Sequence, residues 1–263
     1  MRFWLAVLAV CALCAPPAEG LSIKRVSRQS ASARRRLSVN SLLTDRGTLE
    51  IEWGNLFAAS GNYSMPSLIK YTPAGEGWFL GKTEYSIGFD SISSQVSDGV
   101  RDTQFSDRIS MFAHTKLIDG DHFDIAVAPQ ASFLLRGDNG ARLGGAVLGR
   151  FDYGQNSGGW NVSWTGATVS SATNPAGTAD IGFGYGRKLG ASGRWNQWTA
   201  HAETLIEKST GAAKIFSLFQ GAEYQITPRA AIDASIQEID LRGANRDTQF
   251  VVALTVNMGK LKK

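Results

Sequence analysis

The chain has 263 residues and a mean hydropathy of −0.13, and with 43% hydrophobic residues it is too polar to be a bundle of membrane-spanning helices. Its 29 glycines, 7 prolines and 10% aromatic content exclude low-complexity disorder and favour strands joined by tight turns. The net charge of +4 is unevenly distributed, because residues 21–46 carry +6 and residues 47–263 carry −2. One short segment therefore makes the chain basic, while the body is slightly acidic.

The first twenty residues have the pattern of a secretory signal peptide. Arg2 is followed by an unbroken apolar run, residues 3–13, which is too short to span a bilayer as a helix. Ala18 and Gly20 are the small residues that a signal peptidase reads, so residues 1–20 are expected to be removed. A buried N-terminal helix is the alternative, but no polar residue alternates with the apolar run.

Both cysteines, Cys11 and Cys14, lie within this predicted signal peptide, so the mature chain has none for a disulfide, a nucleophile or a metal site. Residues 8–11 (LAVC) resemble a lipoprotein cleavage box, although Val10 is bulkier than such a box prefers.

The Ser/Arg-rich residues 21–46 are expected to form a basic flexible N-terminal segment. Contact with anionic lipid headgroups and entry into a lumen as a plug are the alternatives. Nucleic acid is not an expected partner, because the chain is exported and the segment has no interleaved aromatic residues.

From residue 47 onward the sequence alternates apolar residues with polar or small ones and shows no helical period of any length. In residues 180–186 (DIGFGYG) large apolar side chains alternate strictly with glycine. Residues 108–117, 123–135 and 250–258 repeat the period of two, with Phe112 as an exception. Clusters of Gly, Asn, Asp, Ser or Pro separate the runs, which predicts strands joined by turns.

Twelve strands are expected, roughly at 47–57, 62–72, 77–90, 103–118, 121–136, 141–153, 158–169, 178–189, 194–207, 212–226, 229–241 and 247–258. Strands in soluble proteins average roughly five to six residues, whereas a tilted membrane-spanning strand needs about nine to eleven. Short connections at 73–76, 119–120 and 227–228 contrast with long polar ones at 91–102 and 170–177.

These features predict an all-β fold, a closed antiparallel transmembrane β-barrel of about 12 strands formed by residues 47–263. Aromatic residues fall near the expected strand ends, as interfacial girdles do: Tyr71, Trp78, Phe79, Phe89, Phe105, Phe151, Tyr153, Trp160, Trp195, Trp198 and Tyr224. A soluble lipocalin-like or sandwich protein is the alternative.

Several segments resemble the family of outer-membrane β-barrel transporters associated with the meta-pathway of phenol degradation. They are residues 46–52 (RGTLEIE), 66–71 (PSLIKY), 224–229 (YQITPR) and 231–233 (AID). The resemblance covers most of residues 47–258 and implies an exported barrel of transporter or porin type, without implying phenol as the solute. The chain departs from many outer-membrane barrels in its last residues, 257–263, which lack a terminal aromatic residue.

An enzyme is not predicted. None of the three histidines, His114, His122 and His201, has a Ser, Asp or Glu beside it in a recognisable catalytic motif. His201 and Glu203 share one strand face, which is compatible with a hydrogen-bonded pair or half of a metal site, but zinc needs three or four ligands. No cofactor and no metal are expected.

The inward face of the barrel carries the candidate functional residues. A charged side chain facing hydrocarbon costs about 2–4 kcal/mol for Arg or Lys near the midplane, so these residues are expected to point into the lumen. The candidate solute path comprises Lys82, Glu84, Arg108, His114, Lys116, Arg142, Arg150, Asp180, His201 and Glu203. These charges either border a narrow aqueous path or pair across the lumen and fill it.

The sequence therefore predicts an outer-membrane barrel of transporter or porin type that passes small solutes through a charged lumen. Its expected partners are outer-membrane lipid, small solutes and the outer-membrane assembly machinery. The alternatives are a non-conducting barrel that acts as a structural or surface-interaction protein through residues 91–102 and 170–177, and a soluble exported β-protein.

Overall fold

The computed structural model describes residues 25–29, 33–37, 46–75, 82–97, 100–105, 108–135, 140–170, 175–191, 193–241 and 246–260. The predicted signal peptide, residues 1–20, lies outside the described residues, as do Trp78 and Phe79 of the predicted girdle. In the part of the chain that is described, no helix is long and apolar enough to cross a membrane.

Twelve long strands form the body of the protein. They are β3 (Thr48–Ala58), β4 (Tyr63–Tyr71), β5 (Thr83–Ser97), β7 (Arg108–Asp119), β8 (Phe123–Leu134), β9 (Ala141–Tyr153), β10 (Asn156–Ala167), β11 (Gly177–Lys188), β12 (Trp198–Ser209), β13 (Lys214–Thr227), β14 (Ala230–Ile239) and β15 (Asp247–Lys260). The other described elements are β1 (Arg25–Gln29), β2 (Ala33–Leu37), β6 (Val100–Gln104) and the 3₁₀ turn η2 (Gly193–Gln197).

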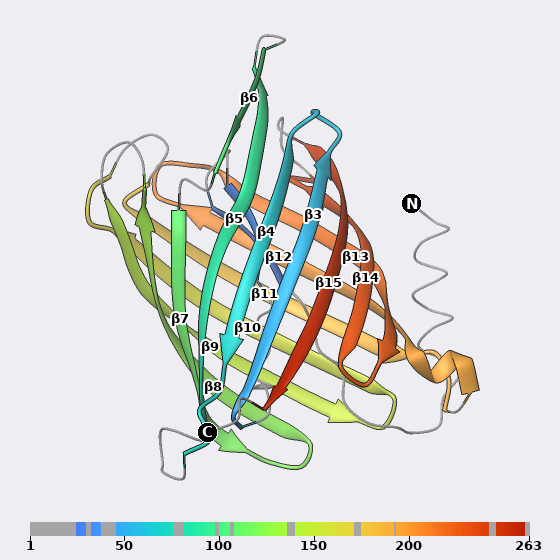
Figure 1. The fold of residues 1–263 in the computed structure, drawn as a ribbon. Coiled ribbons are helices and arrows are strands. Elements are labelled where there is room, and N and C mark those ends of the chain that lie inside the picture. Colours follow the sequence, from blue (N-terminus) through green and yellow to red (C-terminus); the bar gives the residue numbers. More distant parts are fainter. Residues whose placement is uncertain are drawn as a thin grey trace.

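The twelve strands pair antiparallel with their neighbours in the chain and close into a ring. β15 pairs with β3, β3 with β4, and β4 with β5, so no edge of the twelve-stranded sheet is left open. Figure 1 shows the tilted strands surrounding one interior. Closure matters in lipid because an open edge would leave backbone donors and acceptors without partners. The predicted closed antiparallel β-barrel of about 12 strands is confirmed.

Two predicted elements differ from the structure. Residues 91–102, expected to be a loop, belong largely to β5 and β6, which pair from Ser93 to Gln104 as a hairpin. Figure 1 shows this hairpin projecting beyond the end of the barrel. The strand expected from residue 194 begins at Trp198, because η2 takes up residues 193–197.

The barrel is apolar outside and polar inside. Large apolar side chains that are exposed lie at alternate positions along the strands, and they include Trp53, Ile69, Ile87, Met111, Val147, Val162, Ile181, Ile206, Ile232 and Phe250. Polar and charged side chains at the intervening positions are buried, and they include Glu52, Lys70, Glu84, Arg108, His114, Asp124, Arg150, Asn161, Glu203, Asp233 and Gln249. This inverts the pattern of a soluble β-sandwich and suits a barrel surrounded by hydrocarbon.

Glycines on the outer face lie beneath aromatic rings of the adjacent strand. A Cβ atom added to Gly158 would lie 2.0 Å from the ring of Phe151, and one added to Gly149 would lie 2.3 Å from the ring of Trp160. The register places both rings on the neighbouring strand of the β9–β10 pair. Each ring covers the backbone of a glycine that would otherwise face lipid. Because any larger residue would clash with the ring, the glycine is needed for the ring to lie there.

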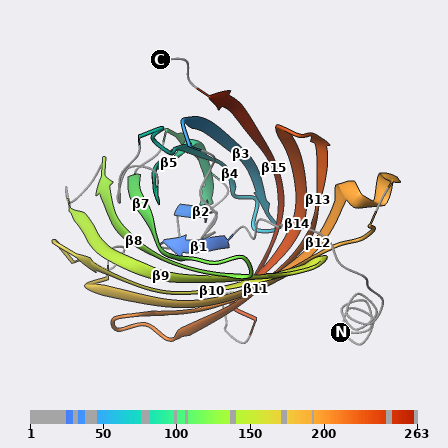
Figure 2. The ribbon, with the colours of Figure 1, turned by 90° about the horizontal axis from the view of Figure 1, so that it is seen from below.

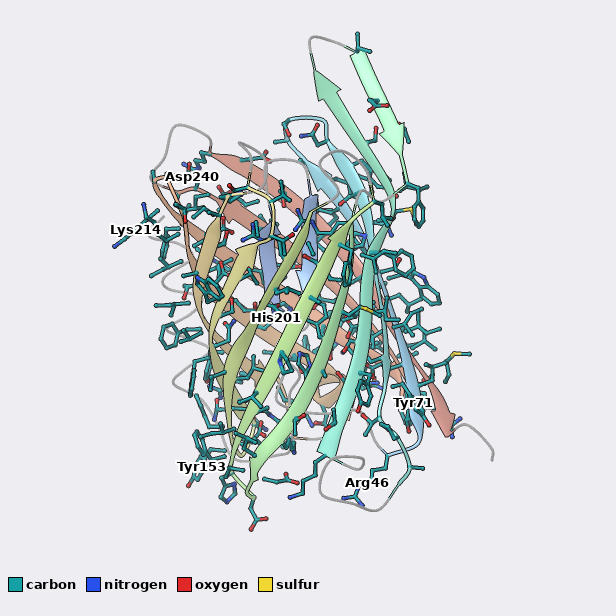
Figure 3. The ribbon with its side chains drawn as sticks, turned by 90° about the vertical axis from the view of Figure 1, so that its left-hand side faces the viewer. Arg46, Tyr71, Tyr153, His201, Lys214 and Asp240 are labelled. Atoms are coloured by element: carbon teal, nitrogen blue, oxygen red, sulfur yellow. The ribbon has the colours of Figure 1, made fainter. Side chains whose placement is uncertain are left out.

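The two ends of the barrel differ. The β7–β8, β9–β10 and β13–β14 connections are short and lie at the end where β3 begins and β15 ends, whereas β5–β6 extends the opposite end. The β3–β4 turn, residues 59–62, is short although it lies at the β5–β6 end. Tyr71 and Tyr153 lie near the short-turn end with Arg46, far from Lys214 and Asp240 (Figure 3). Trp198 and Tyr224 also lie near the short-turn end, where their ring centroids are 4.8 Å apart.

The outward assignment predicts a depth-dependent cost of charge. Ile181 lies mid-strand between Val162 and Ile206, while Leu117 lies beside the β7–β8 turn. We expect Ile181→Arg to lower the free energy of unfolding by about 2–4 kcal/mol and Leu117→Arg by about 0–1 kcal/mol. Guanidinium titration in lipid vesicles, followed by tryptophan fluorescence, measures both. Equal costs at the two positions would contradict the assignment of Ile181 to the hydrocarbon.

Candidate functional site in the barrel interior

The period of two along each strand brings the candidate residues to one surface. Among the described residues, charged side chains from eleven strands, β3–β5, β7–β9 and β11–β15, face the interior, and antiparallel register sets which of them meet. Most contacts in the following groups join residues on neighbouring or next-neighbouring strands, so their geometry follows mainly from strand pairing.

One ion-pair group lies near the short-turn end, on β7, β8 and β9. Arg150 is the register partner of Asp124, and its guanidinium also pairs with Asp152 on the same strand. Lys116 Nζ lies 2.7 Å from Asp119 Oδ1 and 3.5 Å from Asp124 Oδ2. These charges pair with one another along the wall.

A second group lies on β3 and β4. Lys70 is the register partner of Glu50, and its Nζ lies 3.0 Å from Glu50 Oε1 and 2.6 Å from Glu52 Oε1. The Lys70 ammonium donates a hydrogen bond to each carboxylate, so one cation is shared between two anions. None of these three residues is among the ten candidates predicted from the sequence.

Besides Lys116, three predicted site residues lie on β5 and β7, and Lys82 directly precedes β5. Glu84 and His114 are register partners, and His114 Nδ1 lies 3.5 Å from Glu84 Oε1. Arg108, at the other end of β7, donates from Nη1 to Ser132 Oγ over 3.3 Å. Lys82 lies just before β5 and is half-buried. Phe112 is buried on the inward face beside His114, which confirms it as the exception in its strand.

Arg142 on β9 is held by neutral acceptors. Its Nη2 donates to Thr165 Oγ1 at 2.9 Å and to Thr178 Oγ1 at 2.8 Å, and its Nη1 donates to the Pro175 carbonyl at 2.8 Å. The acceptors of the guanidinium fork thus lie on β10, on β11 and in the connection between them.

Strands β11 and β12 carry an acidic strip, which we define as Asp180, Glu203 and Glu207. Asp180 and Glu207 are direct register partners, and Asp180 Oδ2 accepts a hydrogen bond from Ser163 Oγ at 2.8 Å. Glu203 and Glu207 are both buried. Sequence analysis missed Glu207, although its parity with His201 and Glu203 could have identified it.

His201 does not pair with its sequence neighbour Glu203. Its Nε2 lies 2.7 Å from Asp233 Oδ2, on β14 across β13, and its ring stacks on Phe219 with centroids 5.4 Å apart. Asp233 also accepts from Ser235 Oγ at 3.2 Å. Figure 3 shows His201 near mid-height in the barrel. Among the described residues, no group of three or more His, Cys, Asp or Glu could hold a metal ion.

The interior is closely filled at the level of these residues. Glu84, Arg108 and Asp233 are 2%, 3% and 1% exposed, although each faces inward. A wide aqueous path beside them would leave them accessible to water. The structure therefore brings the ten predicted residues to the interior face and shows them in a packed arrangement.

Of the comparisons with known proteins, the one with solved structures bears on the fold. No family model matches the chain, and no curated protein matches its sequence. Among solved structures, the chain is similar to the KdgM porin, with a TM-score of 0.55 and 10% identity over 80% of this chain and 99% of that chain. It is also similar to the NanC porin in a rhombohedral crystal form, with a TM-score of 0.57 and 11% identity over 79% and 98% of the two chains. At these identities the likeness shows the fold alone.

The pairing of His201 with Asp233 predicts an energetic coupling between β12 and β14. His201→Phe keeps the stacking on Phe219 but removes a hydrogen bond to a buried carboxylate, so we expect a loss of about 1.5–3 kcal/mol in the free energy of unfolding. In an Asp233→Asn background the same change should cost at least about 1 kcal/mol less. Denaturant titration in vesicles measures the cycle.

His122 is the matched control for this cycle, because it is exposed at the β7–β8 turn beside Tyr153. His122→Phe should be additive with Asp233→Asn. If the costs of His201→Phe and Asp233→Asn are also additive, the interaction between His201 and Asp233 contributes nothing to the free energy of unfolding.

Proposed function

We propose that this chain is an outer-membrane barrel of porin or transporter type, which passes small solutes through its charged interior without covalent chemistry. The observation that carries the proposal is the inverted alternation of a closed twelve-stranded barrel, apolar outside and charged inside. A wall built only for mechanical support has no need of so many buried charges, each of which is costly to desolvate. The fold shared with the KdgM and NanC porins supports the proposal.

The proposed solute path follows the predicted residues Lys82, Glu84, Arg108, His114, Lys116, Arg142, Arg150, Asp180, His201 and Glu203. Their charges would orient and filter a solute, as rings of charge do in selective pores. Small outer-membrane barrels are filled by side chains, and those of sixteen or more strands are open, so twelve strands suit a narrow path. We infer no catalytic role and no cofactor for these residues.

The wall favours cations. Among the described residues, its inward carboxylates outnumber its inward ammonium and guanidinium groups: the former are Glu50, Glu52, Glu84, Asp124, Asp152, Asp180, Glu203, Glu207, Glu223, Asp233 and Asp247, and the latter are Lys70, Lys82, Arg108, Lys116, Arg142 and Arg150. One solved KdgM structure is described as a complex with disordered oligogalacturonate, at a TM-score of 0.56 and 9% identity over 80% of this chain and 99% of that chain. We carry over from it the passage of small solutes and not that solute.

The same proposal has three further parts. Residues 1–20 direct export, the barrel lies in the outer membrane, and it contacts the lipid of that membrane and the assembly machinery. Membership in the transporter family associated with the meta-pathway of phenol degradation remains a hypothesis based on sequence pattern. A non-conducting barrel is the second candidate, favoured by the close packing around Glu84, Arg108 and Asp233 and by the projecting β5–β6 hairpin.

The path predicts conduction with a charge-dependent selectivity. The experiment measures the conductance and reversal potential of refolded protein in planar bilayers under a KCl gradient. It compares the chain from residue 21 with the same chain lacking residues 21–45, and heat-shifted gel mobility checks that each is folded. We expect discrete conductance steps and a cation-selective reversal potential from at least the shorter chain. Arg108→Glu should shift that potential further towards cations, because it replaces an inward cation by an anion.

Lys208→Glu is the matched control, since it makes the same charge change on an exposed residue near the rim. It should leave the reversal potential unchanged. A folded, heat-modifiable barrel that gives no steps with or without residues 21–45 would refute conduction and favour the non-conducting candidate.

A further inference from the structure

The N-terminal hairpin lies inside the barrel. Within residues 21–46, expected to be flexible, the structure describes β1 and β2, which pair antiparallel as a separate two-stranded sheet. β1 lies against β12, while β2 lies against β4 and β5. Figure 2 shows both strands surrounded by the ring of barrel strands, and Figure 1 places them in the half of the barrel nearer the β5–β6 hairpin. The hairpin therefore crosses the interior from one wall to the other.

The burial of the wall requires material inside the ring. Wall side chains alone fill a barrel of about eight strands, and twelve strands enclose a wider interior. Nevertheless Glu203 and Glu207 are buried, and the register gives Glu203 only Gly184 and Phe219 as direct cross-strand partners. β11 presents Gly182, Gly184 and Gly186 inward beside β12, so this part of the wall leaves room for another segment of chain.

The acidic strip of Asp180, Glu203 and Glu207 brings three carboxylates together on two adjacent strands. Asp180 and Glu207 lie directly opposite each other, an arrangement that is unfavourable without nearby cations. The charge of Arg142 acts on both of them, but its guanidinium is also hydrogen-bonded to Thr165 and Thr178. Residues 25–37 contain five arginines and no acidic residue. The hairpin that touches β12 thus carries the complementary charge.

We infer that the β1–β2 hairpin is an internal plug, held electrostatically by the acidic strip of β11 and β12, and that it closes the solute path while it remains there. This inference rests on the proposed function. The plug occupies the site that a cationic solute would use, so a solute or a change of charge that competes for the strip releases it. The closed backbone ladder of the barrel does not include the hairpin, because in the described sheets β1 and β2 pair with each other.

The test uses the protein from residue 21 and two separate readouts. The strip variant Asp180→Asn/Glu203→Gln/Glu207→Gln removes the charge without changing side-chain size. The hairpin variant Arg25→Gln/Arg28→Gln removes the two arginines of β1, the strand that lies against β12. Trypsin cleavage after Arg34, Arg35 and Arg36, followed by mass spectrometry, reports whether the hairpin is sheltered, and planar-bilayer conductance reports whether the path is open.

We expect the unmodified chain to be protected from trypsin and to conduct rarely. Both variants should be cleaved faster, by about tenfold or more, because cleavage follows the population of the released state. Their open probability should rise in parallel. Arg25→Lys/Arg28→Lys keeps the charge of β1 and should stay closed. Asp102→Asn/Asp121→Asn/Glu238→Gln removes three carboxylates from β6, a turn and the rim instead of from the strip, and should also stay closed.

Two results would overturn the inference, and they differ in what they say of the pore. If the unmodified chain conducts and its hairpin is cleaved as fast as in the strip variant, the hairpin is no plug, while the proposed function stands. If the hairpin is protected and a folded barrel without residues 21–45 still gives no conductance, there is no path to close, and the proposed function fails together with the gating.

Discussion

In lipid, every backbone donor and acceptor must be paired within the protein, and the other features of this molecule follow from that requirement. A sheet in hydrocarbon is stable only when closed, and closure gives each strand residue one of two environments, lipid or interior. Ile181 and Ile206 meet on the outside, and one residue away Asp180 and Glu207 meet on the inside. A slip of one residue in any strand would exchange the two sets, so the register is strongly determined.

Filling the interior with charge creates the second problem, because each buried charge requires partners. On β3–β4 and β7–β9 the wall supplies them itself, through Lys70 with Glu50 and Glu52, and through Arg150 and Lys116 with Asp124. On β11–β12 three carboxylates, Asp180, Glu203 and Glu207, lie close together, and β1 of the arginine-rich hairpin lies against β12. Under the inferred plug, the self-paired walls would form the stable framework and the hairpin would be the part that can be released.

The sequence was sufficient for the features that depend on local periodicity. The strict alternation in residues 180–186 assigned Ile181 and Asp180 to opposite faces, and the length of the runs distinguished a membrane barrel from a sandwich. It was insufficient where strand pairing decides the outcome. His201 pairs with Asp233, 32 residues away, and not with Glu203, because the registers of β12, β13 and β14 bring that carboxylate across. The β5–β6 hairpin was missed because it projects beyond the barrel, so its strands carry no apolar stripe.

The two-environment pattern can be measured directly, since the chain after residue 20 has no cysteine of its own. Single cysteines placed along β12 from Thr199 to Ser209, spin-labelled in vesicles, report access to oxygen in lipid and to a polar relaxation agent in water. We expect oxygen access to peak at Ala200, Ala202, Thr204 and Ile206 and to fall at the residues between them. Access to the two agents without a period of two, or with the opposite phase, would contradict a barrel with a charged interior.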